Sequence, residues 1–258
     1  TLIIFESKFM KFNEWFVWKI YALHHIYCKY KLNKLVPGVI NIIEDYQKKT
    51  KSTGTKFPTL YRAVKLIIEK KPKYILESGT GTSTLVLAEA VLKIQKTNPN
   101  YSCEIISMES IQEWYDMANN LLPKKYRHIV KIILGKRKLF EYSMFRGYCH
   151  SNIPAKDYDL VFLDGPNYDD NYGSSTCMDA LKVRLGSEKN IIHCVVDTRV
   201  STVFMMQKIF RKSDIKYYSI FRASSFKMHK IEHCPKLNSN NFQSNINGKI
   251  RLKSNFNL

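Results

Sequence analysis

The sequence predicts an α/β fold, a doubly wound and mostly parallel seven-stranded sheet with an antiparallel C-terminal hairpin and an N-terminal helical extension. Between residues 58 and 212, short apolar runs alternate with stretches of helical periodicity, which is the pattern of repeated strand–helix units. The last two apolar runs, 216–222 and 226–231, are separated only by residues 223–225. A connection that short cannot cross over a sheet, so these two strands are expected to pair antiparallel.

The 258 residues are expected to hold one such domain with two additions. Residues 1–50 form the helical extension, residues 51–234 form the α/β domain, and residues 235–258 form a basic tail rich in asparagine and serine. The segment 48–58, rich in lysine and threonine, is expected to be a linker.

The individual elements follow from the same periodicities. Five parallel strands are expected at 74–78, 104–109, 129–134, 160–164 and 191–197. Helices are expected at 60–70, 82–96, 175–185 and 201–212, with a further helix that begins at a capping box, Ser110 to Glu113, and ends before Pro123. The segment 136–156 is expected to be a loop or a short helix.

The first 35 residues are aromatic and basic. Apolar side chains recur there at helical spacing, at Phe12, Phe16, Ile20, Leu23, Tyr27 and Tyr30. This face predicts a helix that packs on the main domain or forms a lid over its site; the alternative is a membrane-surface or partner-binding helix. Lysines and histidines interrupt the apolar stretch, so neither a transmembrane helix nor a signal peptide is expected.

The chain carries a net charge of +19. Such a charge is compatible with a nucleic acid or an anionic membrane as partner, but an abundance of lysine, asparagine and isoleucine favours a solvated basic surface. One segment departs from this pattern, because residues 157–179 contain six aspartates and no lysine or arginine. The six cysteines form no C-x-x-C pair, which disfavours a zinc site and predicts reduced thiols in a cytoplasmic protein.

A glycine turn, Gly79-Thr-Gly81, joins the first parallel strand to the next helix. Turns of this kind present free backbone N–H groups to a nucleotide-like ligand. A nicotinamide dinucleotide usually requires a third glycine where Thr84 stands, and a P-loop requires a lysine after the second glycine. Both of these ligands are therefore disfavoured.

The stretch from Glu77 to Ser83 resembles motif I of the class I S-adenosylmethionine-dependent methyltransferases, an acidic residue followed by G-x-G. Glu109, at the end of the second strand, and the segment Asp157–Pro166 resemble two further motifs, and the likeness covers about residues 58–231. The resemblance implies a methyltransferase that binds S-adenosylmethionine through Glu77, Gly79, Gly81, Ser83, Glu109 and Asp164.

In this family Glu109 would hold the ribose hydroxyls, the N–H groups of the turn would hold the methionine carboxylate, and Glu77 would lie near the ammonium. Gly135-Lys136 departs from the pattern, because many members carry an acid there, near the adenine. Backbone groups near Lys136 or Arg137 are the alternative adenine contact.

The segment Leu163–Pro166 indicates the acceptor. It lacks the Asp/Asn-Pro-Pro-aromatic motif of base-methylating relatives, and the chain has no Pro-Cys dipeptide. The Asp-Gly opening resembles O-methyltransferases of small molecules and sugars, with Asp164 as the catalytic proton acceptor. A divalent cation between Asp164 and Asp197 is a less favoured possibility, and the other interpretation is that Asp197 caps the next helix.

Several other side chains are weaker candidates for the site. His150, His193 and His229 are possible bases, although a lone histidine is more often structural. The loop pairs Tyr168/Tyr172 and Asp169/Asp170 would line an acceptor pocket or stay exposed.

The resulting prediction is O-methylation of a small-molecule or glycan acceptor. The alternatives are an RNA methyltransferase that uses its basic surface, an aminopropyl transferase of the polyamine type, whose Gly-Gly-Gly-Asp run is absent, and a binding module without activity. A nucleic-acid partner is not favoured, and a weak contact with a membrane surface stays open.

Overall fold

The computed structural model describes residues 2–50, 56–143, 145–165, 176–197, 199–210, 215–218 and 223–231, with side chains from residue 18 onward outside 215–218. Its main sheet has seven strands in the order β3-β2-β1-β6-β7-β9-β8. These strands are β1 (Tyr74–Ser78), β2 (Glu104–Glu109), β3 (Val130–Leu134), β6 (Leu160–Leu163), β7 (Ile191–Val196), β8 (Ile215–Tyr218) and β9 (Ala223–His229). The first five of this list pair in parallel, and β9 runs antiparallel to both β7 and β8. The predicted fold class is confirmed.

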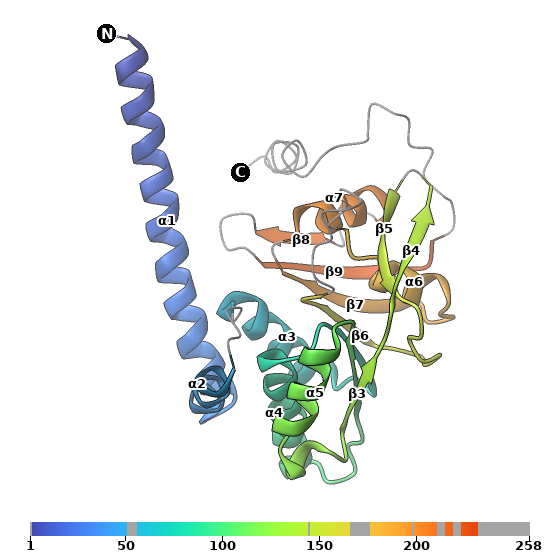
Figure 1. Ribbon diagram of the computed structural model, residues 1–258. Helices are drawn as coiled ribbons and strands as arrows, with labels where there is room; N and C mark the ends of the chain where they lie inside the picture. The colour runs from blue at the N-terminus through green and yellow to red at the C-terminus, as the bar shows by residue number, and fades with distance from the viewer. Residues whose placement is uncertain are drawn as a thin grey trace.

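Helices cover both faces of this sheet (Figure 1). On one face lie α3 (Phe57–Lys70), α4 (Thr82–Thr97) and α5 (Gln112–Leu121), and on the other α6 (Asp179–Leu185) and α7 (Val200–Ile209). Each face has its own apolar core, and the central strands are buried on both sides. That double burial explains why these strands read as continuous apolar runs in the sequence.

The segment after β3 is a hairpin, so the predicted loop or short helix is wrong. Strands β4 (Arg137–Tyr142) and β5 (Phe145–His150) pair antiparallel as a separate two-stranded sheet. The backbone of β5 is further tied to the chain before α6, because the Tyr148 N–H donates to the Thr176 carbonyl at 3.0 Å. The turn contains Ser143 at φ 56° instead of the Asn-Gly or Asp-Gly pair that would have indicated a hairpin.

Two boundaries differ from the prediction. Residues 223–225 were expected to connect the last two strands, but Ala223 begins β9, and the connection falls on 219–222, outside the described residues. Helix α3 was expected to begin at residue 60 but begins at Phe57. Pro58 lies in its first turn, where a missing N–H costs no hydrogen bond.

The predicted capping box before α5 is also wrong. Ile111 stands at the N-cap without a side-chain cap, and the Ser110 hydroxyl is buried with no partner among the described residues. Glu109 takes the role instead, since its Oε1 accepts the backbone N–H groups of Ser110 at 2.7 Å and Ile111 at 3.0 Å. A carboxylate is a stronger acceptor than a serine hydroxyl, and the Glu109 carboxylate lies one residue before Ser110.

The N-terminal extension consists of α1 (Leu2–Leu35) and α2 (Val39–Lys49), with Gly38 at φ 82° in the turn between them. Helix α1 lies against α3, α2 lies against α4, and the first half of α1 extends away from the sheet (Figure 1). Cys28 and Leu32 form the buried face of α1. The face predicted to pack is wrong where it is described, because Leu23 and Tyr30 are exposed.

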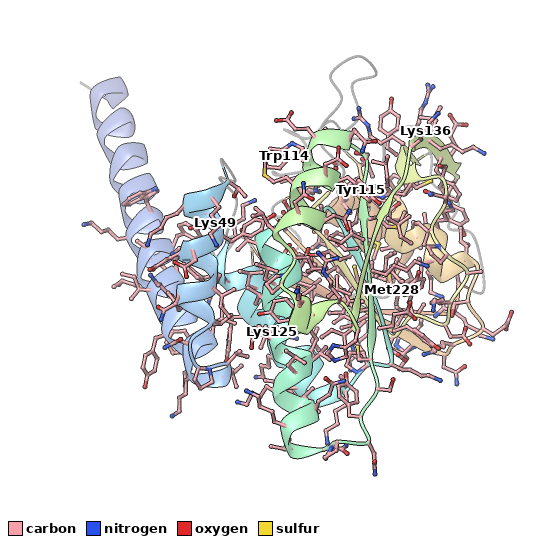
Figure 2. The ribbon with its side chains drawn as sticks, turned by 60° about the horizontal axis from the view of Figure 1, so that its bottom comes forward. Lys49, Trp114, Tyr115, Lys125, Lys136 and Met228 are labelled. Atoms are coloured by element: carbon pink, nitrogen blue, oxygen red, sulfur yellow. The ribbon has the colours of Figure 1, made fainter. Side chains whose placement is uncertain are left out.

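Side chains fill the space between the helices and the sheet (Figure 2). Met228 of β9 is completely buried, whereas Lys49, Lys125 and Lys136, also labelled in Figure 2, are exposed. The five cysteines in the described part of the chain are free thiols. Within the described ranges, none of the helices combines the length and the apolar character that crossing a bilayer requires.

Candidate functional site

Four acidic side chains gather at one edge of the main sheet. Glu77 is the penultimate residue of β1, Glu109 ends β2, and Asp164 and Asp197 directly follow β6 and β7. Because these strands are parallel, their carboxyl ends meet at the same edge, where ligands of open α/β sheets bind. Asp164 is partly exposed and the other three are buried.

The glycine turn after β1 contacts the loop after β6 backbone to backbone. A Cβ on Gly79 would lie 2.8 Å from the Gly165 nitrogen, and a Cβ on Gly165 would lie 2.6 Å from the Gly79 Cα. Gly79 also adopts φ 92°, and its N–H donates to the Met108 carbonyl at 2.9 Å. Gly81 adopts φ 148° and has open space where its side chain would be, directly before α4. The turn therefore depends on both glycines, and it leaves room beside the start of α4.

Glu77 lies beneath this turn in a network of hydroxyl groups. Thr84 and Ser107 donate to its Oε2, both at 2.6 Å, and Thr84 in turn accepts the Gly81 N–H at 3.0 Å. The Oε1 atom is buried and has no partner among the described residues. Complete burial raises the pKa of Glu77 to about 7, although the hydroxyls of Ser107, Ser83 and Thr84 oppose the shift. Thr84, which stands where a third glycine would be, thus links the turn to the incompletely paired carboxyl of Glu77.

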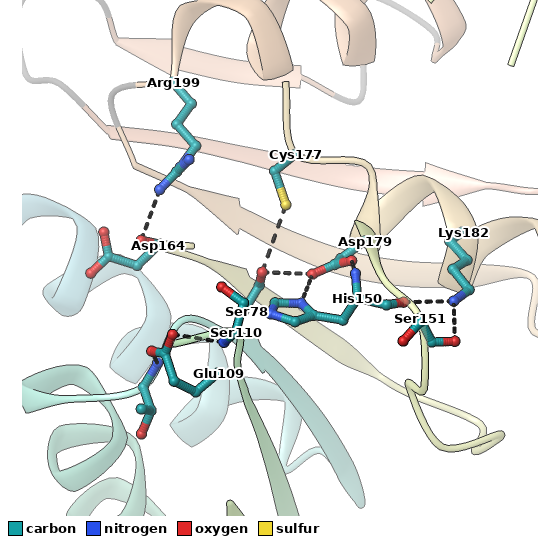
Figure 3. Close-up of polar contacts among 11 residues, drawn as sticks. Ser78, Glu109, Ser110, His150, Ser151, Asp164, Cys177, Asp179, Lys182 and Arg199 are labelled. Carbon is teal, nitrogen blue, oxygen red and sulfur yellow. Dashed lines mark hydrogen bonds and ion pairs between the residues drawn. The ribbon is translucent and has the colours of Figure 1, made fainter. Parts of the chain in front are cut away.

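Glu109 connects the turn to the start of α5. Besides the two N–H groups that its Oε1 accepts, its Oε2 accepts the Thr80 N–H at 3.4 Å. A carboxylate can accept about four hydrogen bonds, so it retains acceptor capacity for a ligand hydroxyl. Figure 3 shows Glu109 and Asp164 on the same side of Ser78.

Asp164 and Asp197 form an electrostatically coupled pair. Burial, followed by the negative charge of Asp197, raises the pKa of Asp164 to about 7, while Arg199 and Lys56 oppose the shift. Asp197 itself is paired with both cations: its Oδ1 lies 3.3 Å from the Arg199 Nε, and its Oδ2 lies 3.4 Å from the Lys56 Nζ. The Arg199 Nη2 also donates to the backbone carbonyl of Asp164 at 2.9 Å (Figure 3).

This donor set does not fit a divalent cation between Asp164 and Asp197. Two side-chain cations already neutralise Asp197, and the described residues contain no group of three histidine, cysteine or acidic side chains that could hold a metal ion. Asp197 instead accepts the backbone N–H of Arg199 at 3.1 Å, at the start of α7. The capping interpretation of Asp197 describes these contacts.

A second polar network lies on the opposite face of β1. Asp179, at the start of α6, accepts the Ser78 hydroxyl at 2.6 Å and lies 2.7 Å from the His150 Nδ1. Its other oxygen accepts the His150 backbone N–H at 2.7 Å, and Ser78 also contacts the Cys177 Sγ at 3.7 Å. His150 and Asp179 are both 0% exposed, and the His150 interactions hold the pKa of Asp179 below its usual value despite burial.

The structure brings together most of the residues predicted for the site. Glu77, Gly79, Gly81, Glu109 and Asp164 lie at the carboxyl edge, and Ser83 is buried in the first turn of α4.

The predicted histidines do not lie at this edge. His193 is in the middle of β7, where burial lowers its pKa, and His229 pairs with Ile191 at the amino end of that strand. His150 is engaged by Asp179. The loop pairs Tyr168/Tyr172 and Asp169/Asp170 lie outside the described residues.

Sequence reasoning did not identify the partners of the acids. From the sequence, Thr84 stands out only as a missing glycine, and no pattern predicts Ser107, Lys56 or Arg199 as partners of the acids. A signal existed for Ser107, because alternation along β2 places it on the same face as Glu109, two residues before it.

Comparisons with known proteins give distant structural matches only. No family model and no curated protein sequence matches the chain. An SAH-bound methyltransferase of Podospora anserina matches at 16% identity and a TM-score of 0.47, over 75% of this chain and 88% of that one. A methyltransferase of Geobacter sulfurreducens matches at 11% identity and a TM-score of 0.49, over 74% and 88%. Both TM-scores lie below 0.5, so the fold is described from its own sheet order, the antiparallel β9 and the glycine turn after β1.

The fold is the doubly wound, mostly parallel α/β sheet with an antiparallel hairpin that the sequence predicts. The carboxyl edge formed by β1, β2, β6 and β7 is the site to which a function must be assigned.

Proposed function

We propose that this chain is an S-adenosylmethionine-dependent methyltransferase whose unit is residues 51–234 and which methylates an oxygen of a small-molecule or glycan acceptor. One observation carries the proposal: three carboxyl side chains, Glu77, Glu109 and Asp164, lie at a glycine turn in a chain of net charge +19. Ligands with phosphates would be repelled by such a cluster. A ligand with a sulfonium, an ammonium and a ribose diol matches it.

The two ends of the cofactor correspond to different acids. The buried Oε1 of Glu77 lacks a hydrogen-bond partner among the described residues, and an ammonium near it would supply one and stabilise the ionised carboxylate. Glu109 retains acceptor capacity for the ribose hydroxyls, and the first N–H groups of α4 suit the methionine carboxylate. The extra hydroxyls around the turn hold these groups in place before the ligand binds.

Asp164 is the proposed proton acceptor. Methyl transfer is an in-line displacement at the sulfonium, so the protein chiefly orients the acceptor hydroxyl and removes its proton. A carboxyl whose pKa is raised to about 7 is matched to that task near neutral pH. Arg199 holds the backbone of Asp164, which fixes where the carboxyl projects.

Two features bear on the acceptor and the compartment. The Asp164-Gly165 sequence after β6, which stands in place of an Asp/Asn-Pro-Pro-aromatic motif, supports the O-methyltransferase assignment and not a base-methylating one. The five free cysteines of the described residues support a reducing compartment, in keeping with a cytoplasmic enzyme.

Calorimetric titration with S-adenosylmethionine tests the cofactor assignment. The wild type and a Glu113→Ala variant, altered at an exposed acid in the first turn of α5, are expected to bind equally. Glu109→Ala is expected to weaken binding by about 10–100-fold, because the ribose loses a charged acceptor. Absence of binding to the folded wild type, or equal binding by Glu109→Ala, would refute the assignment.

The role of Asp164 needs a rate measurement. Asp164→Asn is expected to weaken cofactor binding by only about a few-fold, while turnover with a hydroxylated acceptor falls by about 10²–10⁴-fold. An Asn variant that turns over at the wild-type rate would remove Asp164 from the chemistry and leave the cofactor assignment intact.

A further inference from the structure

Helix α1 has an exposed apolar stripe, defined here as Leu23, Ile26, Tyr27 and Tyr30. Their exposed fractions are 68%, 64%, 49% and 63%, although each is a large apolar or aromatic side chain. The spacing of three, one and three residues places all four within an arc of about 100° on the helix surface. They therefore form one continuous strip and not scattered exposed residues.

The opposite face of α1 is the one that packs on the domain. Cys28 and Leu32 are buried, Leu32 in the core shared with α3, and the His25 ring meets the Phe57 ring edge-on at 4.9 Å. Lys29 adds an ion pair to Glu44 of α2 at 3.1 Å. Helix α1 is thus held in place by one face while the apolar stripe points away from the domain.

Lysines bracket the stripe along the helix. Lys19 lies one turn before Leu23 and Lys34 lies one turn after Tyr30, and both are exposed. The Lys31 Nζ lies 5.4 Å from the centre of the Tyr27 ring, which places a further cation beside the stripe. No acidic residue occurs between positions 19 and 34. The surface is therefore apolar along its middle and positively charged at its margins.

These charges disfavour a second copy of the chain as the occupant. In an antiparallel pairing centred on Ile26 and Tyr27, Lys19 of one copy would face Lys34 of the other, and in a parallel pairing like residues would meet. No carboxylate on the stripe would compensate for either arrangement. An anionic bilayer offers what the stripe lacks, because its headgroups pair with lysines and its acyl boundary receives leucine, isoleucine and tyrosine side chains.

We propose that α1 docks this protein on the surface of an anionic phospholipid membrane through the stripe formed by Leu23, Ile26, Tyr27 and Tyr30. The helix lies in the plane of the interface. Its apolar side chains insert below the lipid headgroups, and Lys19 and Lys34 lie among the headgroups. The carboxyl edge belongs to the α/β domain and the stripe belongs to α1, so membrane binding and cofactor binding are separate properties. The proposal does not depend on the proposed function.

The test is vesicle flotation of the full chain with phosphatidylcholine vesicles that do or do not contain phosphatidylglycerol. The wild type is expected to float with the anionic vesicles and not with the neutral ones, and the bound fraction is expected to fall as salt is added. A Leu23→Ser/Ile26→Ser variant is expected to bind the anionic vesicles at least about tenfold more weakly. Thermal unfolding of each variant verifies that it is folded.

A matched control exists elsewhere on the surface. Leu185 and Ile191 are also exposed, at 44% and 40%, but lie at α6 and β7 and outside the stripe. Leu185→Ser/Ile191→Ser removes the same two side-chain types and is expected to float like the wild type. Equal flotation of both double variants, or no flotation of the folded wild type, would overturn the proposal. A dimer in light scattering that only the stripe variant abolishes would assign the stripe to self-association and would also overturn it.

Discussion

Adjacent residues of β1 anchor two polar networks that differ in how completely their charges are paired. Glu77 points to the α4 face and receives only hydroxyl donors, so burial raises its pKa to about 7 and one oxygen stays without a partner in the described structure. Ser78 points to the α6 face and joins Asp179, whose pKa is lowered because His150 supplies both a ring and a backbone donor.

The difference separates a structural network from one suited to a ligand. The Asp179–His150 pair satisfies its buried carboxylate within the protein and ties β1, β5 and α6 together. The Glu77 network leaves an unfavourable charge that an incoming cation would stabilise. Perturbed carboxyls of this kind concentrate at functional sites, and Glu77 lies beneath the glycine turn.

The largest expected effect is the loss of stability when the Asp179–His150 network is broken. Asp179→Ala leaves His150 buried without its carboxylate and Ser78 without its acceptor, so the free energy of unfolding should fall by about 3–5 kcal/mol. Urea denaturation measures it. Asp157→Ala, at an exposed acid, is the control and should change stability by less than about 0.5 kcal/mol. Similar losses in the two variants would contradict a structural role for Asp179.

The stability that the Glu77 network contributes should depend on pH. The pKa of Glu77 is higher in the folded protein than in the unfolded chain, so its contribution to stability is present at low pH and is lost as pH rises from about 4.5 to 7. Glu77→Gln cannot ionise. Relative to the wild type, its free energy of unfolding should therefore improve by about 2–4 kcal/mol between pH 4 and pH 8.

Denaturation of both proteins across this range gives the difference directly. A difference that does not change with pH would mean that Glu77 titrates at its ordinary value and is not held in an unfavourable state.

The smallest expected effect concerns the contact between the two loops. Gly165→Ala places a Cβ 2.6 Å from the Gly79 Cα, so the loops after β1 and β6 must separate, at a cost of about 1–3 kcal/mol in stability. Cofactor binding should weaken as well. Gly186→Ala, whose added Cβ would meet nothing closer than 3.6 Å, is the control. Retention of wild-type stability in Gly165→Ala would show that the contact is not required.

The sequence predicted the parallel strands and the acids at their ends, because apolar runs bounded by glycine and acidic residues carry local signals. It did not predict the hairpin 137–150, whose turn at Ser143 lacks the usual glycine and whose strands mix lysine, phenylalanine and glutamate. Periodicity also identified an apolar face of α1 at Leu23 and Tyr30, but it could not show which face meets the domain, since Cys28 and Leu32 offer an apolar alternative.

Long-range polar partners were beyond the sequence for a different reason. Asp179 and His150 are 29 residues apart, and Lys56 and Asp197 are 141 residues apart, so no local spacing connects them. Glu109 was predicted as a ligand group but also caps the start of α5, a role that local rules had assigned to Ser110. Competition between acceptors is decided by three-dimensional geometry.

The most direct test of the central claim is the number of protons released when S-adenosylmethionine binds. Calorimetry in buffers of different ionisation enthalpy measures it. Glu77 and Asp164 both have pKa values of about 7, and a cationic ligand lowers them, so about one proton should be released at pH 7 and binding should tighten as pH rises from 6 to 8. Binding without proton release, at an affinity independent of pH, would contradict the claim that these carboxyls are held for a cationic ligand.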